Sequence, residues 1–482
     1  MSDPRSELLS RLQQLQSRFT WDLKKEEIDL NNLSTRLQDH IDLQLGQQGA
    51  AARSYSFLAY VRYLQGRPEE AVSLLQQSEK ITRESYGEEN MRRLIVTYGD
   101  LAWLKYHTGD YTQSESYCQA VEDILLTYPT DSSTVLHPEV YGEKAWTYLK
   151  FLKSYYPKGI DCFCQALKLQ PDDSEWNAGY AIALYRTEPR LSGTSNQDEE
   201  SPATKQLRRA LEINPADGVL LSMLALKLVE YNNHREAEGL VESALKLDQD
   251  NPHVMRYIAK YFRIQGEDER SIDLLKRALE RTKHSAFIQH QLAMCYKKKK
   301  TAEQSRRPCS KQKVEQWRRL CIQHLDEAVK IKPSFVLAIA DLALLYGEAK
   351  NLSRAEELFQ LGLQNLPTTE KSICQVLHLR YAEFHHYHTK QEVDAVSQYT
   401  EGLMLTQNTW EWKQCAKKLK QIAERRLSED ENDDEAYALL GLLAKAEGDK
   451  KKAVELYEKA LDCNEDKDEY LSALFELRTE LK

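Results

Sequence analysis

The chain has 482 residues and a formal net charge of −9, and 41% of its residues are hydrophobic. At roughly 100–200 residues per domain, this length accommodates two to four domains or one long repeat array, and the composition excludes a disordered chain. The 18 Gly and 13 Pro argue against a loop-rich scaffold, and the acidic total argues against a general basic coat for nucleic acid or membrane.

The charge is distributed unevenly along the chain. Residues 429–482 contain 17 acidic and eight basic side chains, a difference that equals the whole net charge. Two segments are locally basic: residues 297–319 hold ten Lys and Arg against two Glu, and residues 413–426 hold six against one. Such clusters can contact phosphates, or they can be solvated helix and loop surfaces.

A short pattern of small residues recurs along the chain. It consists of a small residue, a Gly seven positions later and a second small residue five positions after that. It occurs as Ala59, Gly66 and Ala71; Ala102, Gly109 and Ser114; Ala259, Gly266 and Ser271; and Gly441, Gly448 and Ala453. Antiparallel helices approach closely where small side chains meet, and Gly suits the turn between them, so the pattern is typical of tetratricopeptide repeats. The sequence predicts an all-α tetratricopeptide-repeat superhelix, an α-solenoid of about nine to ten helix pairs with a central binding cavity.

Two segments interrupt the repeat. Residues 187–204 lack periodicity and predict a loop between helix pairs, and residues 297–314 separate the two helices of one pair by a loop or by extra turns. We expect three blocks: an N-terminal block over residues 1–130, a middle block over 131–300 and a C-terminal block over 301–482 that ends in the acidic segment.

The motif content favours binding over catalysis. The sequence has no phosphate-binding Gly loop, nucleophile elbow or zinc-protease motif, so we predict no enzymatic activity and no cofactor. The nine Cys are scattered without a CxxC pair, which favours reduced thiols in a cytoplasmic protein over a structural zinc. His385, His386 and His388 could hold a metal or form an ordinary polar helix face. No segment has the length or composition of a membrane span or a signal peptide.

Cationic and aromatic side chains recur on the first helices of the predicted pairs, which line the inner surface of a solenoid. Arg256, Lys260 and Arg263 follow at i, i+4 and i+7, with Tyr257 beside them. Such a stripe can bind phosphates and stack a base, or it can pair with Glu residues of a neighbouring helix.

Two further pairs share the i, i+4 spacing. Trp146 precedes Lys150, with Tyr156 shortly beyond, and Arg36 precedes His40 near the N-terminus. Trp146 alone fits a core position as well as a ligand platform. The three groups agree in chemical type, which indicates an internal site for an anion.

Motifs spread along the chain support a more specific assignment. They are Phe19-Thr20-Trp21, the segment 57–66, His137-Pro138-Glu139 followed by Trp146 and Lys150, the segment 178–182 with Tyr185 and Arg186, Arg256 with Tyr257, His290 with Gln291, and the segment 471–478. In type and order, these motifs resemble the interferon-induced proteins with tetratricopeptide repeats. The resemblance covers the whole chain.

The resemblance implies a cytoplasmic antiviral protein that sequesters single-stranded RNA with a 5′-triphosphate, or with an incompletely methylated cap, in a positively charged internal pocket. It implies that Arg36, His40, Lys150 and Arg186 hold the triphosphate, and that Trp146, Tyr156, Arg256, Tyr257, Lys260, Arg263, His290 and Gln291 contact the first nucleotides. Other family members and innate-immune signalling proteins are further implied partners. Converging cations in a restricted cavity bind a dense anion better than a flat basic surface does.

Three positions depart from the family pattern, and one rival function stays open. His40 stands where the family typically has Gln and introduces pH sensitivity. Asn32 stands where one member has a Glu that helps to hold a metal ion, and Val219 replaces a Tyr. The rival is a protein–protein adaptor, although residues 55–62 lack the Lys-x3-Asn clamp that holds a peptide carboxylate in such proteins.

Overall fold

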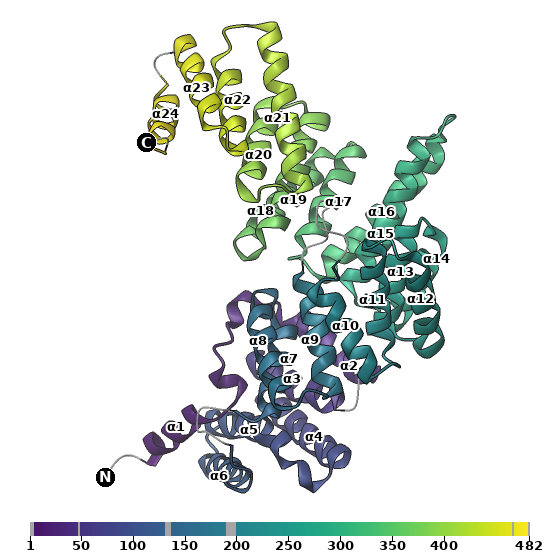
Figure 1. Ribbon diagram of the computed structural model, residues 1–482, viewed down its shortest axis with the longest axis vertical. Coiled ribbons are helices and arrows are strands. Elements are labelled where there is room, and N and C mark those ends of the chain that lie inside the picture. The colour runs from purple at the N-terminus through teal and green to yellow at the C-terminus, as the bar shows by residue number, and fades with distance from the viewer. Residues whose placement is uncertain (1–3, 47–48, 131–135, 189–198, 465–466, 481–482) are drawn as a thin grey trace. The chain divides into compact units, whose positions relative to one another are not determined.

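The computed structural model describes residues 4–46, 49–130, 136–188, 199–464 and 467–480. Within these ranges the chain is helical, with no strand (Figure 1). The predicted all-α tetratricopeptide-repeat fold is confirmed. The chain divides into two compact units, unit 1 (Met1–His284) and unit 2 (Ser285–Lys482). The three-block division remains a prediction.

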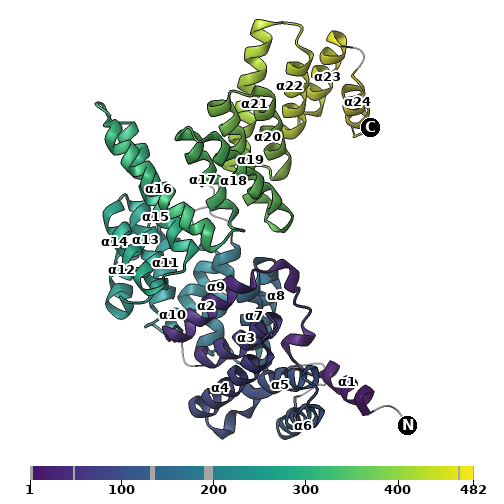
Figure 2. The ribbon, with the colours of Figure 1, turned by 180° about the vertical axis from the view of Figure 1, so that it is seen from behind.

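Unit 1 consists mainly of helix pairs whose two members lie side by side (Figures 1 and 2). It contains α1 (Pro4–Gln14), α2 (Leu30–Asp42), α3 (Ala50–Leu64) with α4 (Pro68–Tyr86), α5 (Ile95–His107) with α6 (Tyr111–Thr127), α7 (Pro138–Phe151) with α8 (Tyr156–Leu169), α9 (Ser174–Thr187) with α10 (Pro202–Ile213), α11 (Gly218–Glu230) with α12 (His234–Asp248), and α13 (Pro252–Gln265) with α14 (Asp268–Arg281). Short 3₁₀ turns cover Arg18–Thr20, Lys25–Glu27, Glu88–Leu94 and Lys153–Tyr155.

Unit 2 repeats the arrangement. It contains α15 (Ala286–Gln304) with α16 (Lys311–Ile331), α17 (Val336–Glu348) with α18 (Leu352–Gln364), α19 (Lys371–Phe384) with α20 (Glu392–Leu405), α21 (Trp410–Glu429), α22 (Asp434–Glu447) with α23 (Lys450–Cys463), and α24 (Asp468–Glu480). A 3₁₀ turn covers Leu366–Thr368 and a π turn covers His385–Thr389. The described part of the chain therefore holds ten helix pairs, within the predicted number.

Glycines end the first helix of several pairs. Gly66, Gly109, Gly266 and Gly448 have φ angles of 79°, 84°, 88° and 86°. A Cβ at any of them would meet nothing within 4 Å, so the left-handed backbone conformation, and not a lack of space, is what favours Gly there.

Small residues at the helix contacts also carry hydrogen bonds between the two helices of a pair. The Ser114 hydroxyl donates to the Ala102 carbonyl at 2.8 Å, and the Ser271 hydroxyl donates to the Ala259 carbonyl at 2.7 Å. Both serines are fully buried. Each bond satisfies a buried hydroxyl while the helices stay close.

A buried ionic network fixes the N-terminal segment to the repeat array. The Arg18 side chain is fully buried and donates to Asp100 of α5 at 2.5 Å, to Ser56 of α3 at 3.1 Å and to Glu143 of α7. Ser17 donates to Asp100 at 2.6 Å. One guanidinium therefore links three helices, including α7, which carries Lys150.

The first predicted interruption falls between α9 and α10. Residues 189–198 of this segment lie outside the described part of the chain, and α10 already begins at Pro202. Glu188 accepts a hydrogen bond from the Ser201 hydroxyl at 2.8 Å and pairs with Lys227 of α11 at 2.8 Å. Residues on both sides of the segment are therefore held to unit 1.

The second interruption consists of extra helical turns, and the loop interpretation is wrong for most of it. Helix α15 continues to Gln304 and α16 begins at Lys311, so that only residues 305–310 connect them (Figure 1). Lys and Gln have high helix propensity, which explains why the charged run stays helical. Lys297 pairs with Asp341 at 2.6 Å, and buried Lys300 pairs with Glu348. Acids of α17 therefore neutralise part of this basic segment.

The second basic segment lies in α21. Arg426 pairs with Asp433 at 2.7 Å, and Arg425 pairs with Glu392 of α20. These ion pairs are partly or largely exposed and contribute little to stability.

None of the described helices combines the length and the apolar character that crossing a membrane requires. All nine cysteines are free thiols, and five of them are buried.

Candidate anion-binding site

Four cationic side chains from four helices of unit 1 converge. They are Arg36 of α2, Lys150 of α7, Arg186 of α9 and Arg256 of α13, and we call them the cation cluster. Arg186 and Arg256 both act electrostatically on Arg36, and Arg36 and Arg186 both act on Lys150. The structure thus brings together the cations that the sequence predicted, from helices far apart in the chain.

Desolvation and repulsion between cations act on two members of the cluster, Arg36 and Lys150. Arg36 is exposed to solvent, yet desolvation by the surrounding protein, followed by repulsion from Arg186 and Arg256, lowers its pKa to about 10. Desolvation lowers the Lys150 pKa to about 7, and repulsion from arginines outweighs the opposing effect of Glu143. A side chain that is accessible and also desolvated lines a space enclosed by protein. An anion in that space would relieve the repulsion.

Tyrosine hydroxyls orient the guanidinium groups without neutralising them. Arg256 Nη2 donates to Tyr257 Oη at 3.2 Å, and its guanidinium carbon lies 4.8 Å from the centroid of that ring. Arg186 interacts with the hydroxyls of Tyr156 and Tyr257. Burial raises the Tyr257 pKa, but the two arginines outweigh this effect and lower it.

Trp146 lies between the hydrophobic core and the cations. Its ring makes an edge contact with Phe163, with centroids 5.5 Å apart. The Arg53 guanidinium carbon lies 5.0 Å from the ring centroid and Lys150 Nζ lies 5.9 Å from it. Arg53 also pairs with Glu175. Trp146 can therefore belong to the hydrophobic core and also serve as a platform for a ligand.

His40 contacts a second histidine that the sequence did not single out. The Nε2 atoms of His40 and His253 are 3.3 Å apart, and the ring centroids are 5.1 Å apart. Desolvation, followed by repulsion from Lys150 and Arg36, holds the His40 pKa well below its usual value. Desolvation and Arg256 have the same effect on the His253 pKa. Both rings are therefore neutral at neutral pH.

The remaining predicted residues of α13 lie further along that helix. Lys260 Nζ lies 6.0 Å from the centroid of the Tyr185 ring, which makes an edge contact with Tyr257. Arg263 lies in the last turn. The predicted stripe therefore runs along α13 away from the cation cluster.

His290 and Gln291 lie on α15 in unit 2, where they form a separate group. Buried His290 places Nε2 3.5 Å from Asp341 Oδ2, and its Nδ1 lies 3.4 Å from the Gln291 amide nitrogen. Burial raises the Asp341 pKa, but Lys297, His290 and Arg380 outweigh this and hold it far below its usual range.

Three residues of these sites were missed by the sequence analysis: Arg53, His253 and Asp341. Arg53 is the one charged residue in the run 50–61, and Asp341 is the one charged residue in the run 335–345. A charge inside an otherwise uncharged run of a first helix is a usable signal for an inward-facing polar group. His253 precedes Arg256 by one helical turn, which is a weaker signal.

The triple-histidine segment forms the π turn after α19. The His385 side chain is buried, and its ring lies 4.5 Å from that of Tyr381. Across the described residues, no group of three or more His, Cys, Asp or Glu is arranged to hold a metal ion.

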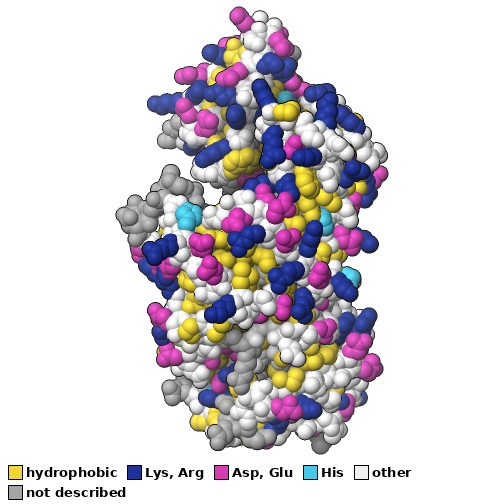
Figure 3. Space-filling model, turned by 90° about the vertical axis from the view of Figure 1, so that its right-hand side faces the viewer, with side chains coloured by type: hydrophobic (Ala, Val, Ile, Leu, Met, Phe, Trp, Pro, Cys, Tyr) yellow, Lys and Arg dark blue, Asp and Glu magenta, His cyan; other side chains and the backbone are white. Residues whose placement is uncertain are grey.

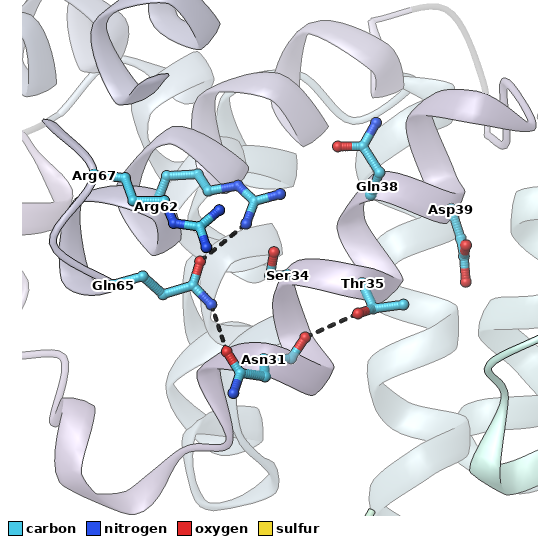
Figure 4. A pocket seen from close by; sticks show the side chains of 8 residues that line it. All are labelled: Asn31, Ser34, Thr35, Gln38, Asp39, Arg62, Gln65 and Arg67. Atoms are coloured by element: carbon cyan, nitrogen blue, oxygen red, sulfur yellow. Dashed lines mark hydrogen bonds between the residues drawn. The ribbon is translucent and has the colours of Figure 1, made fainter. Parts of the chain in front are cut away.

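A pocket of about 260 Å³ lies on another face of α2 (Figure 4). It is lined by Asn31, Ser34, Thr35, Gln38, Asp39, Arg62, Gln65 and Arg67. Its polar groups largely satisfy one another: Gln65 donates to Asn31 at 2.8 Å, and Arg62 donates to Gln65 at 3.2 Å. It contains none of the residues predicted from the sequence.

The surface gives no sign of a general basic coat on the face shown in Figure 3. There Lys and Arg side chains are interspersed with Asp and Glu.

Comparisons with known proteins agree with this architecture. Family models described as tetratricopeptide repeat match residues 50–126, 222–286 and 434–467. The human antiviral innate immune response effector IFIT1 is 32% identical over 456 residues, which cover 93% of this chain and 94% of IFIT1. Human interferon-induced protein with tetratricopeptide repeats 2 is 30% identical over 465 residues, which cover 95% of this chain and 96% of that protein.

Solved structures of human IFIT1 match in three dimensions. The IFIT1 dimer with m7Gppp-AAAA aligns with a TM-score of 0.84 at 31% identity, covering 94% of this chain and 99% of that one. The IFIT1 dimer with PPP-AAAA aligns with a TM-score of 0.80 at 32% identity, with the same coverage.

Proposed function

The chain belongs to the interferon-induced proteins with tetratricopeptide repeats, and on that premise we propose that it binds single-stranded RNA through a 5′-triphosphate end held by the cation cluster. The observation that carries the proposal is the convergence of four cations, of which Arg36 and Lys150 have pKa values lowered by desolvation and by repulsion from neighbouring arginines. The protein acts in the cytoplasm as an antiviral factor that sequesters foreign RNA.

A triphosphate supplies negative charge that complements the cation cluster. Its closely spaced negative charges balance several cations at once, and charge-assisted hydrogen bonds from Arg and Lys are stronger in a desolvated site than on an open surface. A 5′-hydroxyl end brings no such charge. Selectivity for the end of the RNA therefore follows from the local charge, independently of base sequence.

The roles of the individual residues follow their positions. Arg36, Lys150 and Arg186 bind the triphosphate, with His40 beside them, and Tyr156 orients Arg186. These residues come from α2, α7, α8 and α9, so the folded repeats set the geometry of the site.

The helix α13 continues the site toward the first nucleotides. Arg256 contacts the phosphate that follows the triphosphate, and Tyr257 stacks on or borders the first nucleotide. Lys260 and Arg263 meet later phosphates along the same helix. Trp146 borders the 5′ end. His290 and Gln291, on α15 of unit 2, are the remaining residues proposed to contact nucleotides.

An incompletely methylated cap is the second candidate end. The relative IFIT1 has been solved with m7Gppp-AAAA as well as with PPP-AAAA. A cap retains the triphosphate bridge and adds an aromatic base, for which the Trp146 ring beside Lys150 offers a stacking partner. Binding alone would block translation or replication of the RNA, and no bond needs to be broken.

The test compares one RNA sequence with four 5′ ends: hydroxyl, monophosphate, triphosphate and cap. We expect affinity to rise from hydroxyl to triphosphate, and Arg36→Gln to remove most of that rise. Equal affinity for the hydroxyl and triphosphate ends would refute the proposal. Capture of a partner protein that survives nuclease treatment, together with absent end selectivity, would favour an adaptor.

A further inference from the structure

His40 and His253 form a contact that joins the two ends of unit 1. His40 lies in the last turn of α2 and His253 in the first turn of α13, and their Nε2 atoms are 3.3 Å apart. Neither ring is exposed. In such a pair of neutral imidazoles one Nε2 carries a hydrogen and the other accepts it, so the pair shares one N–H···N bond.

The strongest charges acting on the two rings are cations. They come from Arg36 on α2, Lys150 on α7, Arg186 on α9 and Arg256 on α13. The acids nearest to these helices are engaged elsewhere: Glu143 pairs with Arg18, Glu175 pairs with Arg53 from α3, and Asp39 lines the pocket on another face of α2. Tyr156 and Tyr257 contribute hydroxyls that contact Arg186.

One nitrogen of the pair lacks a well-formed hydrogen bond. His40 Nδ1 is buried, and none of the described residues forms a hydrogen bond of good geometry with it, although the Leu45 backbone favours the protonated ring. A buried polar atom without a full hydrogen bond costs free energy, of the order of 1–3 kcal/mol. The cations that act on the ring oppose its protonation, and an anion that enters the site would favour it.

We propose that the His40–His253 pair is a proton-accepting component of the anion site. When a 5′-triphosphate enters, the pair takes up one proton from solvent, a new N–H bond forms on the imidazole pair, and the positive charge that the pair gains attracts the phosphate oxygens. His253 thereby becomes a ligand-positioning residue, because its own Nε2 holds the His40 ring in place. The inference rests on the proposed function and adds a residue and a proton to it.

The sign of the effect follows from linkage. Repulsion keeps the pair unprotonated in the empty site, and phosphate charge favours the protonated pair. Binding therefore consumes a proton, and affinity for the triphosphate end increases as the pH falls into the acidic range, by up to about tenfold per pH unit for one linked proton. A glutamine side chain cannot take up a proton in this pH range. The double variant His40→Gln/His253→Gln therefore loses this increase in affinity while it keeps hydrogen-bonding side chains.

The experiment measures binding of a 5′-triphosphate and a 5′-hydroxyl form of one oligoribonucleotide from about pH 8 to about pH 5.5 at constant ionic strength. Wild type is compared with His40→Gln/His253→Gln and with the control His234→Gln, whose exposed ring lies on α12. The terminal phosphate itself titrates near pH 6, but identically for every protein variant. We expect the ratio of wild-type to double-variant affinity to rise about tenfold over the lowest pH unit, with the control unchanged.

Calorimetry supplies a second readout. Wild-type protein and the double variant are titrated with the triphosphate RNA in buffers of different ionisation enthalpy near pH 6, which reports protons taken up per RNA bound. Lys150 contributes equally in both proteins, so an uptake that is larger in wild type than in the double variant supports the proposal. No excess uptake, or a double variant whose pH dependence equals that of wild type, overturns the proton linkage while end selectivity stands. Loss of end selectivity in wild type itself would instead overturn the proposed function.

Discussion

Lys150 offers the sharpest quantitative prediction, because its pKa in the empty site is about 7. At pH 8 roughly a tenth of the molecules carry a protonated Lys150, and at pH 9 roughly a hundredth. Triphosphate binding requires the charged form, so each binding event above pH 7 includes uptake of a proton. Affinity should therefore fall by up to about tenfold per pH unit between pH 7 and pH 9.

The substitution Lys150→Arg separates this effect from general electrostatics. A guanidinium stays protonated throughout this range, so the variant should bind with an affinity that depends only weakly on pH above 7. The control is Lys168→Arg on α8, whose side chain is exposed, and it should retain the wild-type slope. Affinity falls as the pH rises because the Lys150 pKa is lowered in the absence of RNA and is raised again by the bound triphosphate.

Fluorescence anisotropy with a labelled 5′-triphosphate RNA at constant ionic strength gives the dissociation constants. The terminal phosphate is almost fully ionised above pH 7.5, so its titration adds little over this range. A flat wild-type profile between pH 7 and pH 9 would show that Lys150 is already charged in the empty site. A Lys150→Arg variant with the wild-type slope would show that another group takes up the proton.

Three further substitutions test the site and the scaffold. Arg256→Gln should weaken binding of triphosphate RNA and reduce the slope of log affinity against log salt by about 0.7, because one phosphate contact is lost; an unchanged slope in a salt titration would exclude that contact. Arg18→Met should lower the free energy of unfolding by about 3–5 kcal/mol, since the buried Asp100 and the partly buried Glu143 lose their partner, whereas thermal unfolding of Arg209→Gln, in an exposed pair, should change little. Gly142→Ala should lower the free energy of unfolding by at least about 1–3 kcal/mol, because its Cβ would lie 2.2 Å from the indole nitrogen of Trp176. Gly239→Ala, with open space around it, should be neutral or stabilising by up to about 1 kcal/mol.

The fold was predictable because its determinants are local. Gly66 and Gly266 end first helices in a left-handed conformation that favours Gly, and Ala259 and Ser271 meet where the helices of a pair touch. Each signal lies within one repeat, so spacing alone reveals it. The basic insertion was less predictable, because a charged run of helix-forming residues outside the repeat pattern is compatible with a loop as well as with extra helical turns.

The site was predictable in its cations but not in its contacts. Arg256 was found from spacing on its own helix, and Arg36 and His40 share one face of α2 for the same reason. The approach of His253 to His40 depends on how α2 meets α13 across unit 1, and no periodicity within either helix encodes that. The pairing of Arg53 with Glu175 likewise arises between different repeats.

End selectivity is the central claim, and the ratio of affinities for triphosphate and hydroxyl forms of one RNA tests it most directly. Wild type should prefer the triphosphate by at least about a hundredfold, since two charged hydrogen bonds contribute about 3–6 kcal/mol. Arg186→Gln should reduce this ratio by about tenfold or more while leaving the hydroxyl RNA almost unaffected. A ratio near one in wild type, or an equal loss for both RNAs in the variant, would contradict the account.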